Sequence, residues 1–551
     1  MSRAMGTRQA DSEVQVGGLR SGQRGSSWRR MIAALLAVGV VGCAVGPDYV
    51  APQISAPEAW HAELRGGATA QAADPQALAR WWTTLDDPML TSLIERAVQG
   101  NLDVKKAKAR VREARARRGI NQADLFPTLS ATGPGTYGRG SANVSTDRGS
   151  VEISARESYS VGLDASWEVD VFGGVRRSVE VATADLQASG EDLRNVLVSL
   201  LGEVALNYIE VRTFQNRLAV AEANLAAQTE THELTAIRVA AGLTTVLDLE
   251  QAKYNLESTR SQIPTLHSGL EEAKNRLAIL LGERPGAVHV ELAARHPIPV
   301  PPLEVAIGVP ADLLRRRPDI RQAKRKLASQ TAQIGVATAE LYPKFSLVGS
   351  IGFSALDLTN LLSATSRAYS IGPSVSWRLF DAGAVRKNIE VQSALQEQAL
   401  IQYEATVLTA LEEVENALVA FAEEQRRREA LRNAAQAAER AVALAQSQYD
   451  AGMVDFRSVL DAQRSLLSLQ DQLAQSEGSI TSNVVRLYKA LGGGWTSLPA
   501  EDASGRSRDS GTAISQLESI GLKAGRRPRE GATPESTGPD ASGGAPGAAR
   551  S

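Results

Sequence analysis

Side chains that could carry out covalent or acid–base chemistry are few in this sequence. It contains one cysteine and five histidines in 551 residues. A single cysteine excludes an intramolecular disulfide framework and a cysteine-rich metal site. The histidines are scattered, and His232-Glu233 lacks the second histidine of a zinc-binding helix motif. The sequence has no GxxxxGK[ST] phosphate loop and no GxSxG nucleophile turn. We therefore expect no catalytic residue, no metal site and no enzymatic activity.

The single cysteine, Cys43, stands where a bacterial lipoprotein would be modified. Basic residues ending in Arg30 precede an apolar run, 31–41, which is too short to span a bilayer and fits a signal peptide. Val40-Val41-Gly42-Cys43 follows and is similar to a lipobox. Cleavage before Cys43 would leave its amino group for an acyl chain and its sulfur for a diacylglycerol. The alternative is an ordinary buried cysteine. Because Ala44 follows instead of an aspartate, we expect an outer-membrane lipoprotein whose only non-protein group is this lipid.

Charge gives no sign of a nucleic-acid partner. Lysine and arginine number 60 against 62 acidic residues, for a net charge of −2. One basic run, 105–118, is an exception, and a similar run occurs at 315–326. Charged runs on helices are usually solvated faces. We expect these runs to have a structural role and no nucleic acid to bind.

Two similar halves make up most of the chain. "YSVGLDASWEVDVFGGVRRSVEV" from Tyr159 matches "YSIGPSVSWRLFDAGAVRKNIEV" from Tyr369, and the same offset places "AGL" at Ala241 over "AGM" at Ala451. Each half is predicted to contain a helix of about 30 residues, two extended segments, a very long helix, a glycine turn and a returning helix. The long helices, 174–241 and 384–451, contain no proline and would each be about 100 Å long.

Strict alternation in the extended segments predicts membrane-spanning strands. In the first half, Val161, Leu163 and Trp167 fall on one face, and Asp164, Glu168 and Asp170 on the other. About ten such residues suffice to cross a bilayer as a tilted strand. A soluble sandwich strand has the same pattern, but the chain offers no other strands for a second sheet. Four strands cannot close a barrel alone, so the chain must oligomerise, and three copies would supply twelve strands.

Several motifs together resemble the outer-membrane factors of tripartite efflux systems, TolC-like and specifically the NodT-type lipoproteins paired with resistance-nodulation-division pumps. They are "GCAVGPDY" at Gly42, "WW" at Trp81, "RRRPDI" at Arg315, "AELYPKFSL" at Ala339, "SWRLFDAG" at Ser376 and "VLDAQRSLL" at Val459. The resemblance implies a membrane α+β fold: a homotrimeric, twelve-stranded outer-membrane β-barrel with four strands per protomer, continuing into a long periplasmic α-helical barrel. Its partners would be outer-membrane lipid, a periplasmic adaptor (membrane fusion) protein and an inner-membrane resistance-nodulation-division pump.

The same resemblance implies roles for the glycine turns. The periplasmic gate would include Tyr449, Asp461 and Arg464. Three Asp461 carboxylates would converge on an axis, and this ring could hold cations or be balanced by Arg464, one helical turn on. Val454 and Arg457 depart from the family pattern, so the gate is expected to be wired differently here. The alternative is that Asp461 is a solvated helix residue. The expected adaptor-contacting residues at the two tips are Gly242, Leu243, Thr244, Gly452, Met453 and Val454.

The predicted organisation divides the chain at composition changes and repeat boundaries. The segments are a lipoprotein signal peptide (1–42), an N-terminal anchor and equatorial segment (43–88), the first repeat (89–282), a linker and equatorial segment (283–310), the second repeat (311–492) and a disordered C-terminal tail (493–551). The favoured function is a passive outer-membrane efflux channel. A duct for type I protein secretion and a structural, periplasm-spanning lipoprotein are the alternatives.

Overall fold

The computed structural model describes residues 44–53, 57–72, 74–139, 155–301 and 304–495. The predicted signal peptide, Cys43, and all but the first three residues of the predicted tail lie outside the described residues. Within those ranges, no helix combines the length and the apolar composition that a membrane crossing requires.

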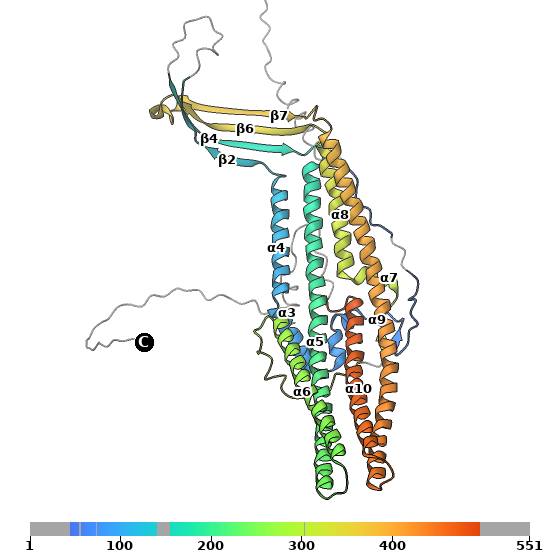
Figure 1. Cartoon of the computed structure of the whole chain (residues 1–551). Coiled ribbons are helices and arrows are strands. Elements are labelled where there is room, and N and C mark those ends of the chain that lie inside the picture. The colour runs from blue at the N-terminus through green and yellow to red at the C-terminus, as the bar shows by residue number, and fades with distance from the viewer. Residues whose placement is uncertain (1–43, 54–56, 73, 140–154, 302–303, 496–551) are drawn as a thin grey trace, which may run out of the picture. The chain divides into compact units, whose positions relative to one another are not determined.

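Helices of matching length occur in the same order in both halves (Figure 1). α4 (Leu102–Ala123) and α8 (Pro318–Ala339) each have 22 residues. α5 (Gly174–Ala240) and α9 (Ala384–Asp450) each have 67, as the absence of proline predicted. The returning helices α6 (Val246–Leu281) and α10 (Phe456–Ala490) have 36 and 35 residues.

The prediction of one 30-residue helix at the start of each half is wrong. α3 (Pro88–Gly100) is separated from α4 by Asn101, and α7 (Pro310–Arg316) is separated from α8 by Arg317. Asn101 caps α4 by accepting from Asp103 N at 2.8 Å, whereas Arg317 precedes a proline, which disfavours helical backbone. The two residues at which the helices are interrupted also bind the end of a returning helix. Asn101 donates to Leu280 O at 2.9 Å, and Arg317 donates to Ala490 O at 3.0 Å.

One antiparallel sheet joins the two halves. Its order is β2 (Thr128–Thr132), β4 (Arg156–Val169), β6 (Lys344–Ala355) and β7 (Arg367–Ser376), and β3 (Gly135–Gly138) also pairs with β4. β2 and β3 keep a single register against β4, so they form one strand interrupted at Gly133-Pro134. The sheet therefore has four strand positions, and the β2/β3 and β7 edges are unpaired among the described residues.

The predicted alternation holds over most of the sheet, with Val348 opposite Ser166 and Phe353 opposite Arg367 as exceptions. Apolar residues pair with apolar ones, as in Trp167 with Leu347 and Leu347 with Pro373, while Asp164 pairs with Ser350 and Glu168 with Ser346. One face is thus apolar and the other polar. Asp170 was predicted on the polar face, but β4 ends at Val169 and Asp170 is not a strand residue. Its carboxylate instead accepts from Val175 N and Arg176 N at 3.2 and 2.8 Å, which caps the first turn of α5.

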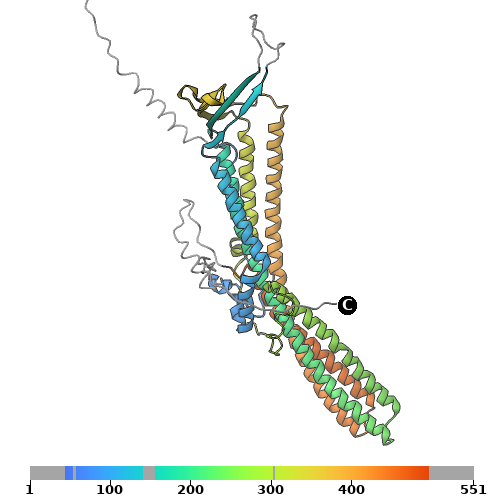
Figure 2. The same ribbon diagram turned by 90° about the vertical axis from the view of Figure 1, so that its left-hand side faces the viewer.

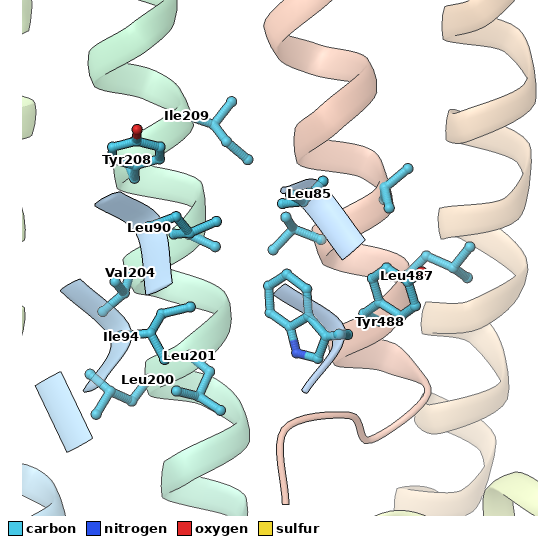
Figure 3. Packing of buried hydrophobic residues seen from close by; sticks show 14 of the residues in the cluster. Leu85, Leu90, Ile94, Leu200, Leu201, Val204, Tyr208, Ile209, Leu487 and Tyr488 are labelled. Carbon is cyan, nitrogen blue, oxygen red and sulfur yellow. The ribbon is translucent and has the colours of Figure 1, made fainter. Parts of the chain in front are cut away.

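The main core lies where α3, α5 and α10 meet (Figure 3). Leu90 and Ile94 of α3 face Leu200 and Val204 of α5, and all four are buried. The core is closed by chain segments distant in sequence: β1 (Ala68–Thr69) pairs in parallel with β5 (Val305–Ala306), and the Trp81 ring stacks on Tyr488 at 5.4 Å. The structure therefore brings the predicted N-terminal segment, the linker and the end of α10 together.

α5 is the central helix of the bundle. It packs against α3, α4, α6, α8 and α10, whereas α9 packs against α8 and α10. In two perpendicular views the α5–α6 and α9–α10 turns lie at the same end of the helices, away from the sheet (Figure 2). These two turns hold the predicted adaptor-contacting residues.

Candidate functional site

The two turns have the same backbone construction. Gly242 and Gly452 take left-handed φ values of 72° and 70°, which glycine adopts without strain. The next residue, Leu243 or Met453, donates back to Arg238 O or Gln448 O, each at 2.8 Å. Such bonds close a helix end in the Schellman manner. The predicted contact residues Leu243 and Met453 are therefore presented outward, with 76% and 68% of their surfaces exposed.

The helix that follows each turn begins at a capping residue. Thr245 and Asp248 form a reciprocal capping box at the start of α6, and the Asp455 carboxylate accepts from Ser458 N at the start of α10, at 3.1 Å. Thr244 and Val454 precede these caps and are half-buried. The caps fix the direction in which the turns point, so both turns are presented on rigid helix ends.

An ion pair joins the two turns. Arg238 of α5 donates to the Asp450 carboxylate of α9 at 2.7 Å, and its guanidinium lies 5.1 Å from the centre of the Tyr449 ring. The hydrogen bond from Arg238 holds the pKa of Asp450 below its usual range. Tyr449 also packs on Phe456, with ring centres 5.2 Å apart, and its hydroxyl lies 3.5 Å from Thr244 Oγ1. We call Arg238, Tyr449 and Asp450 the tip latch.

Asp461 belongs to a second group, on α10. Arg464 Nη1 lies 3.3 Å and Arg457 Nε 3.6 Å from the Asp461 carboxylate. Arg464 also reaches α6, donating to Asn255 Oδ1 at 3.0 Å and lying over the Tyr254 ring at 5.2 Å. We call Asp461, Arg457, Arg464 and Asn255 the α10 charge cluster. It connects the second returning helix to the first.

The structure thus separates the predicted gate residues into two groups. Tyr449 is in the tip latch, while Asp461 and Arg464 are in the α10 charge cluster, and the Asp461–Arg464 pairing predicted from the sequence is present. The sequence analysis missed Arg238, Asp450 and Asn255. Arg457 had been noted only as a departure from the family pattern, although its spacing of four residues from Asp461 is the signal of a helical ion pair.

The predicted lumen-facing residues Asp164 and Glu168 lie on the polar face of β4. Asp164 shares a cross-strand row with Ser130 and Ser350, and Thr132 Oγ1, from the next row on the same face, donates to Asp164 Oδ2 at 2.8 Å. Ser370 continues that row beyond Ser350 and hydrogen-bonds to it at 2.8 Å. The row is hydrophilic from strand to strand and suits a water-filled surface.

Comparison with known proteins gives a consistent answer. The family model described as "Outer membrane efflux protein" matches residues 93–283 and 309–493. The chain is 34% identical to Nodulation protein T of Rhizobium leguminosarum bv. trifolii, covering 82% of this chain and 95% of that protein. It is 32% identical to the solvent efflux pump outer membrane protein SrpC of Pseudomonas putida, covering 84% and 97%. The solved outer-membrane channel OprN is 38% identical with a TM-score of 0.77, covering 82% of this chain and 100% of that one. The chain therefore belongs to the outer membrane efflux protein family.

Proposed function

We propose that three copies of the chain form a passive duct, which carries substrates from an inner-membrane pump and a periplasmic adaptor protein out of the cell. Family membership makes the chain an outer-membrane component of an efflux system. The single observation that carries the assembly is the sheet, which has one apolar face, one polar face and, among the described residues, two unpaired edges. An open edge is not stable in lipid, and barrels of one chain have at least eight strands.

The edges of the sheet indicate how copies would join. The four strand positions run from β2/β3 at one edge to β7 at the other. If β7 of one copy pairs with β2 of the next, three copies close a twelve-stranded barrel whose polar faces line the lumen. Asp164 and Glu168 would then line the channel, and Trp167 and Leu347 would face lipid.

The helices support the same closure. α8 lies against both α5 and α9, whereas its counterpart α4 packs against α5. On α5, Glu191 pairs with Arg321 of α8 and is 6% exposed, but the matching α9 residue, Ile401, is 57% exposed. α4 of a neighbouring copy would cover Ile401 as α8 covers Glu191. We propose this α4–α9 contact as the helical part of the interface.

Native mass spectrometry of the full chain, purified in detergent, tests the assembly. We expect the mass of three chains. Ile401→Arg should shift the protein to monomers, because the arginine would be buried without a partner in the α4–α9 contact. Leu395→Arg is the matched control: Leu395 is also exposed on α9, but its α5 counterpart, Asp185, is exposed as well. A monomeric wild-type protein, or equal effects of the two variants, would contradict the proposal.

We further propose that the α5–α6 and α9–α10 turns are the periplasmic end of the duct. The tip latch and the α10 charge cluster would keep this end closed, and the exposed Leu243 and Met453 would meet the adaptor. Opening would require the Arg238–Asp450 and Arg464–Asn255 contacts to separate, since each joins one hairpin to the other. The gate is tested by the conductance of the trimer in planar bilayers, which should be higher in variants that lack these contacts than in the wild type.

Lipidation of Cys43 is also a proposal. The residues just after it are held at the sheet end of α5: Val45 N donates to Phe172 O at 3.0 Å, and buried Arg177 binds Asp48 at 2.7 Å and Val45 O at 3.2 Å. This docking would keep an acyl-bearing residue beside the membrane. The intact mass of the mature protein should show cleavage before Cys43 and the added lipid. Since a closed barrel holds itself in the bilayer, Cys43→Ser should slow assembly more than it abolishes transport.

A further inference from the structure

A cavity of about 540 Å³ lies between α5, α9 and α10, apart from the two turns. The linker after α6 forms one wall, from Arg295 to Pro301, and α9 contributes Arg428 and Arg432. We call this cavity the arginine groove. Neither the tip latch nor the α10 charge cluster lines it.

Hydrogen bonds to its backbone hold the linker wall in place. Thr481 Oγ1 of α10 donates to Pro299 O at 2.8 Å, in a buried bond. Just before the wall, Arg212 of α5 donates to Ala294 O at 2.9 Å and Gln215 to Leu292 O at 2.7 Å. The chain's own hydrogen bonds therefore preform this wall, which lowers the entropic cost of binding.

The groove has an excess of positive charge. Arg295 pairs with Glu222 at 2.6 Å, but Arg428 and Arg432 form no ion pair within the part of the chain that the structure describes. Arg428 Nε is buried and has no hydrogen-bond partner there. The one acidic residue in the lining, Glu477, accepts from Asn216 at 3.5 Å. A buried, unsatisfied N–H is costly, so an anion that accepts from Arg428 Nε would stabilise the groove.

Other arginines of α9 form ion pairs with glutamates on the same helix. Arg426 and Arg427 each pair with a glutamate three residues earlier, Glu423 and Glu424, at 2.7 and 3.3 Å. The residue three before Arg428 is Gln425, whose amide donates to Gly66 O at 3.0 Å instead. Arg428 and Arg432 are also one helical turn apart, a spacing at which like charges destabilise a helix. Glu429 stands three residues before Arg432, but among the described residues neither Arg428 nor Arg432 forms an ion pair.

We propose that the arginine groove binds an acidic peptide segment of a partner protein in extended conformation. Two arginines one turn apart are separated by about 6 Å along the helix, and alternate side chains of an extended peptide by about 6.6 Å. Two carboxylates in a Glu-x-Glu pattern can thus meet Arg428 and Arg432, each in the fork geometry that arginine favours. Ile298 and Ile480 line the same cavity and give the intervening side chain an apolar contact.

Fluorescence anisotropy tests this on the assembled full chain in detergent, with the fluorescein-labelled peptide Gly-Glu-Val-Glu-Gly. We expect saturable binding that weakens with salt, and no binding of the matched Gly-Gln-Val-Gln-Gly peptide. Arg428→Gln and Arg432→Gln should each weaken binding about tenfold or more, because each removes one charge-assisted contact. Arg426→Gln is the control on the same helix and should leave affinity within about twofold, since Arg426 is paired outside the groove.

Three outcomes would overturn the proposal. Equal binding of the glutamine peptide would show that carboxylates are not recognised. Unchanged affinity of the Arg428→Gln, Arg432→Gln double variant would place the peptide elsewhere. Binding of inorganic phosphate but not of either peptide, lost in the double variant, would assign the groove to a phosphate.

Arg428→Lys keeps the charge but not the fork geometry, so its affinity should lie between those of the wild type and Arg428→Gln. A melting curve for each variant separates lost affinity from lost folding.

Discussion

The two turns at the end of the helical bundle have the same backbone conformation but expose different side chains. At the first turn Val246 is 63% and Leu247 65% exposed, so the start of α6 presents apolar side chains outward. At the matching position of the second turn, Phe456 is 3% exposed and packs with Val459, Leu460 and Ala252. The first turn therefore leaves a larger apolar surface uncovered, whereas the second buries Phe456, exposes Met453 and carries charged residues.

This difference indicates that the two turns have different roles, although they occupy equivalent positions in the two repeats. An uncovered apolar surface on a rigid turn is suited to a protein partner. A packed turn, with the α10 charge cluster starting at Arg457 in the first turn of α10, is suited to holding a closed state. We infer that the first turn contributes more to adaptor binding and the second more to gating. Four changes test this comparison.

The largest effect is expected from Phe456→Ala. Replacing a buried core phenylalanine by alanine lowers the free energy of unfolding by about 3–5 kcal/mol, and the apolar cluster beneath the second turn is small. Hydrogen exchange followed by mass spectrometry should show faster exchange across the α9–α10 turn. Val246→Ala at the matching position of the first turn is the control and should leave exchange unchanged, because that side chain is exposed. Similar increases in both variants would remove the distinction between the turns.

Asp461→Ala should raise the conductance of the proposed trimer severalfold in planar bilayers. The change removes the carboxylate between Arg457 and Arg464 and frees Arg464 from its partner on α10. Glu439→Ala, which removes an exposed acidic residue of α9 that forms no ion pair among the described residues, is the charge-matched control. Unchanged conductance and ion selectivity of Asp461→Ala would mean that Asp461 is a solvated helix residue.

Site-specific photocrosslinkers at Thr244 and Val454 compare the turns as docking surfaces. Both positions are half-buried and immediately precede the cap of a returning helix, so a probe has the same geometry at each. In cells that are exporting, we expect both to capture the adaptor and Thr244 to capture more of it, because apolar side chains surround the first turn. A higher yield at Val454 would reverse the assignment, and no product at either position would refute adaptor docking at the turns.

The sequence predicted what depends on local spacing and missed what depends on tertiary contact. Alternation of residue types predicted the two faces of the sheet, and the Asp461–Arg464 spacing predicted that pair. Asp170 was misplaced because a polar residue in an alternating pattern looks the same whether the strand continues or has ended in a helix cap. Arg238 and Asp450 are 212 residues apart in sequence and on different helices, so no local spacing reveals them.

The smallest expected effect is on the pH dependence of the tip latch. Because Arg238 lowers the pKa of Asp450, the folded-state value lies below the ordinary 3.8. Because the pKa is lowered, the contact contributes its full stability at pH values above the ordinary pKa. That contribution is lost as the pH falls through the folded-state pKa. Conductance of the wild type should therefore be flat near neutrality and rise in acid. Asp450→Asn lacks the charge at every pH, so its conductance should start higher and rise less. Other carboxylates titrate in the same range, and only the difference between the two proteins reports on the latch. Identical pH profiles would show that Arg238–Asp450 is a surface ion pair with no part in closing the duct.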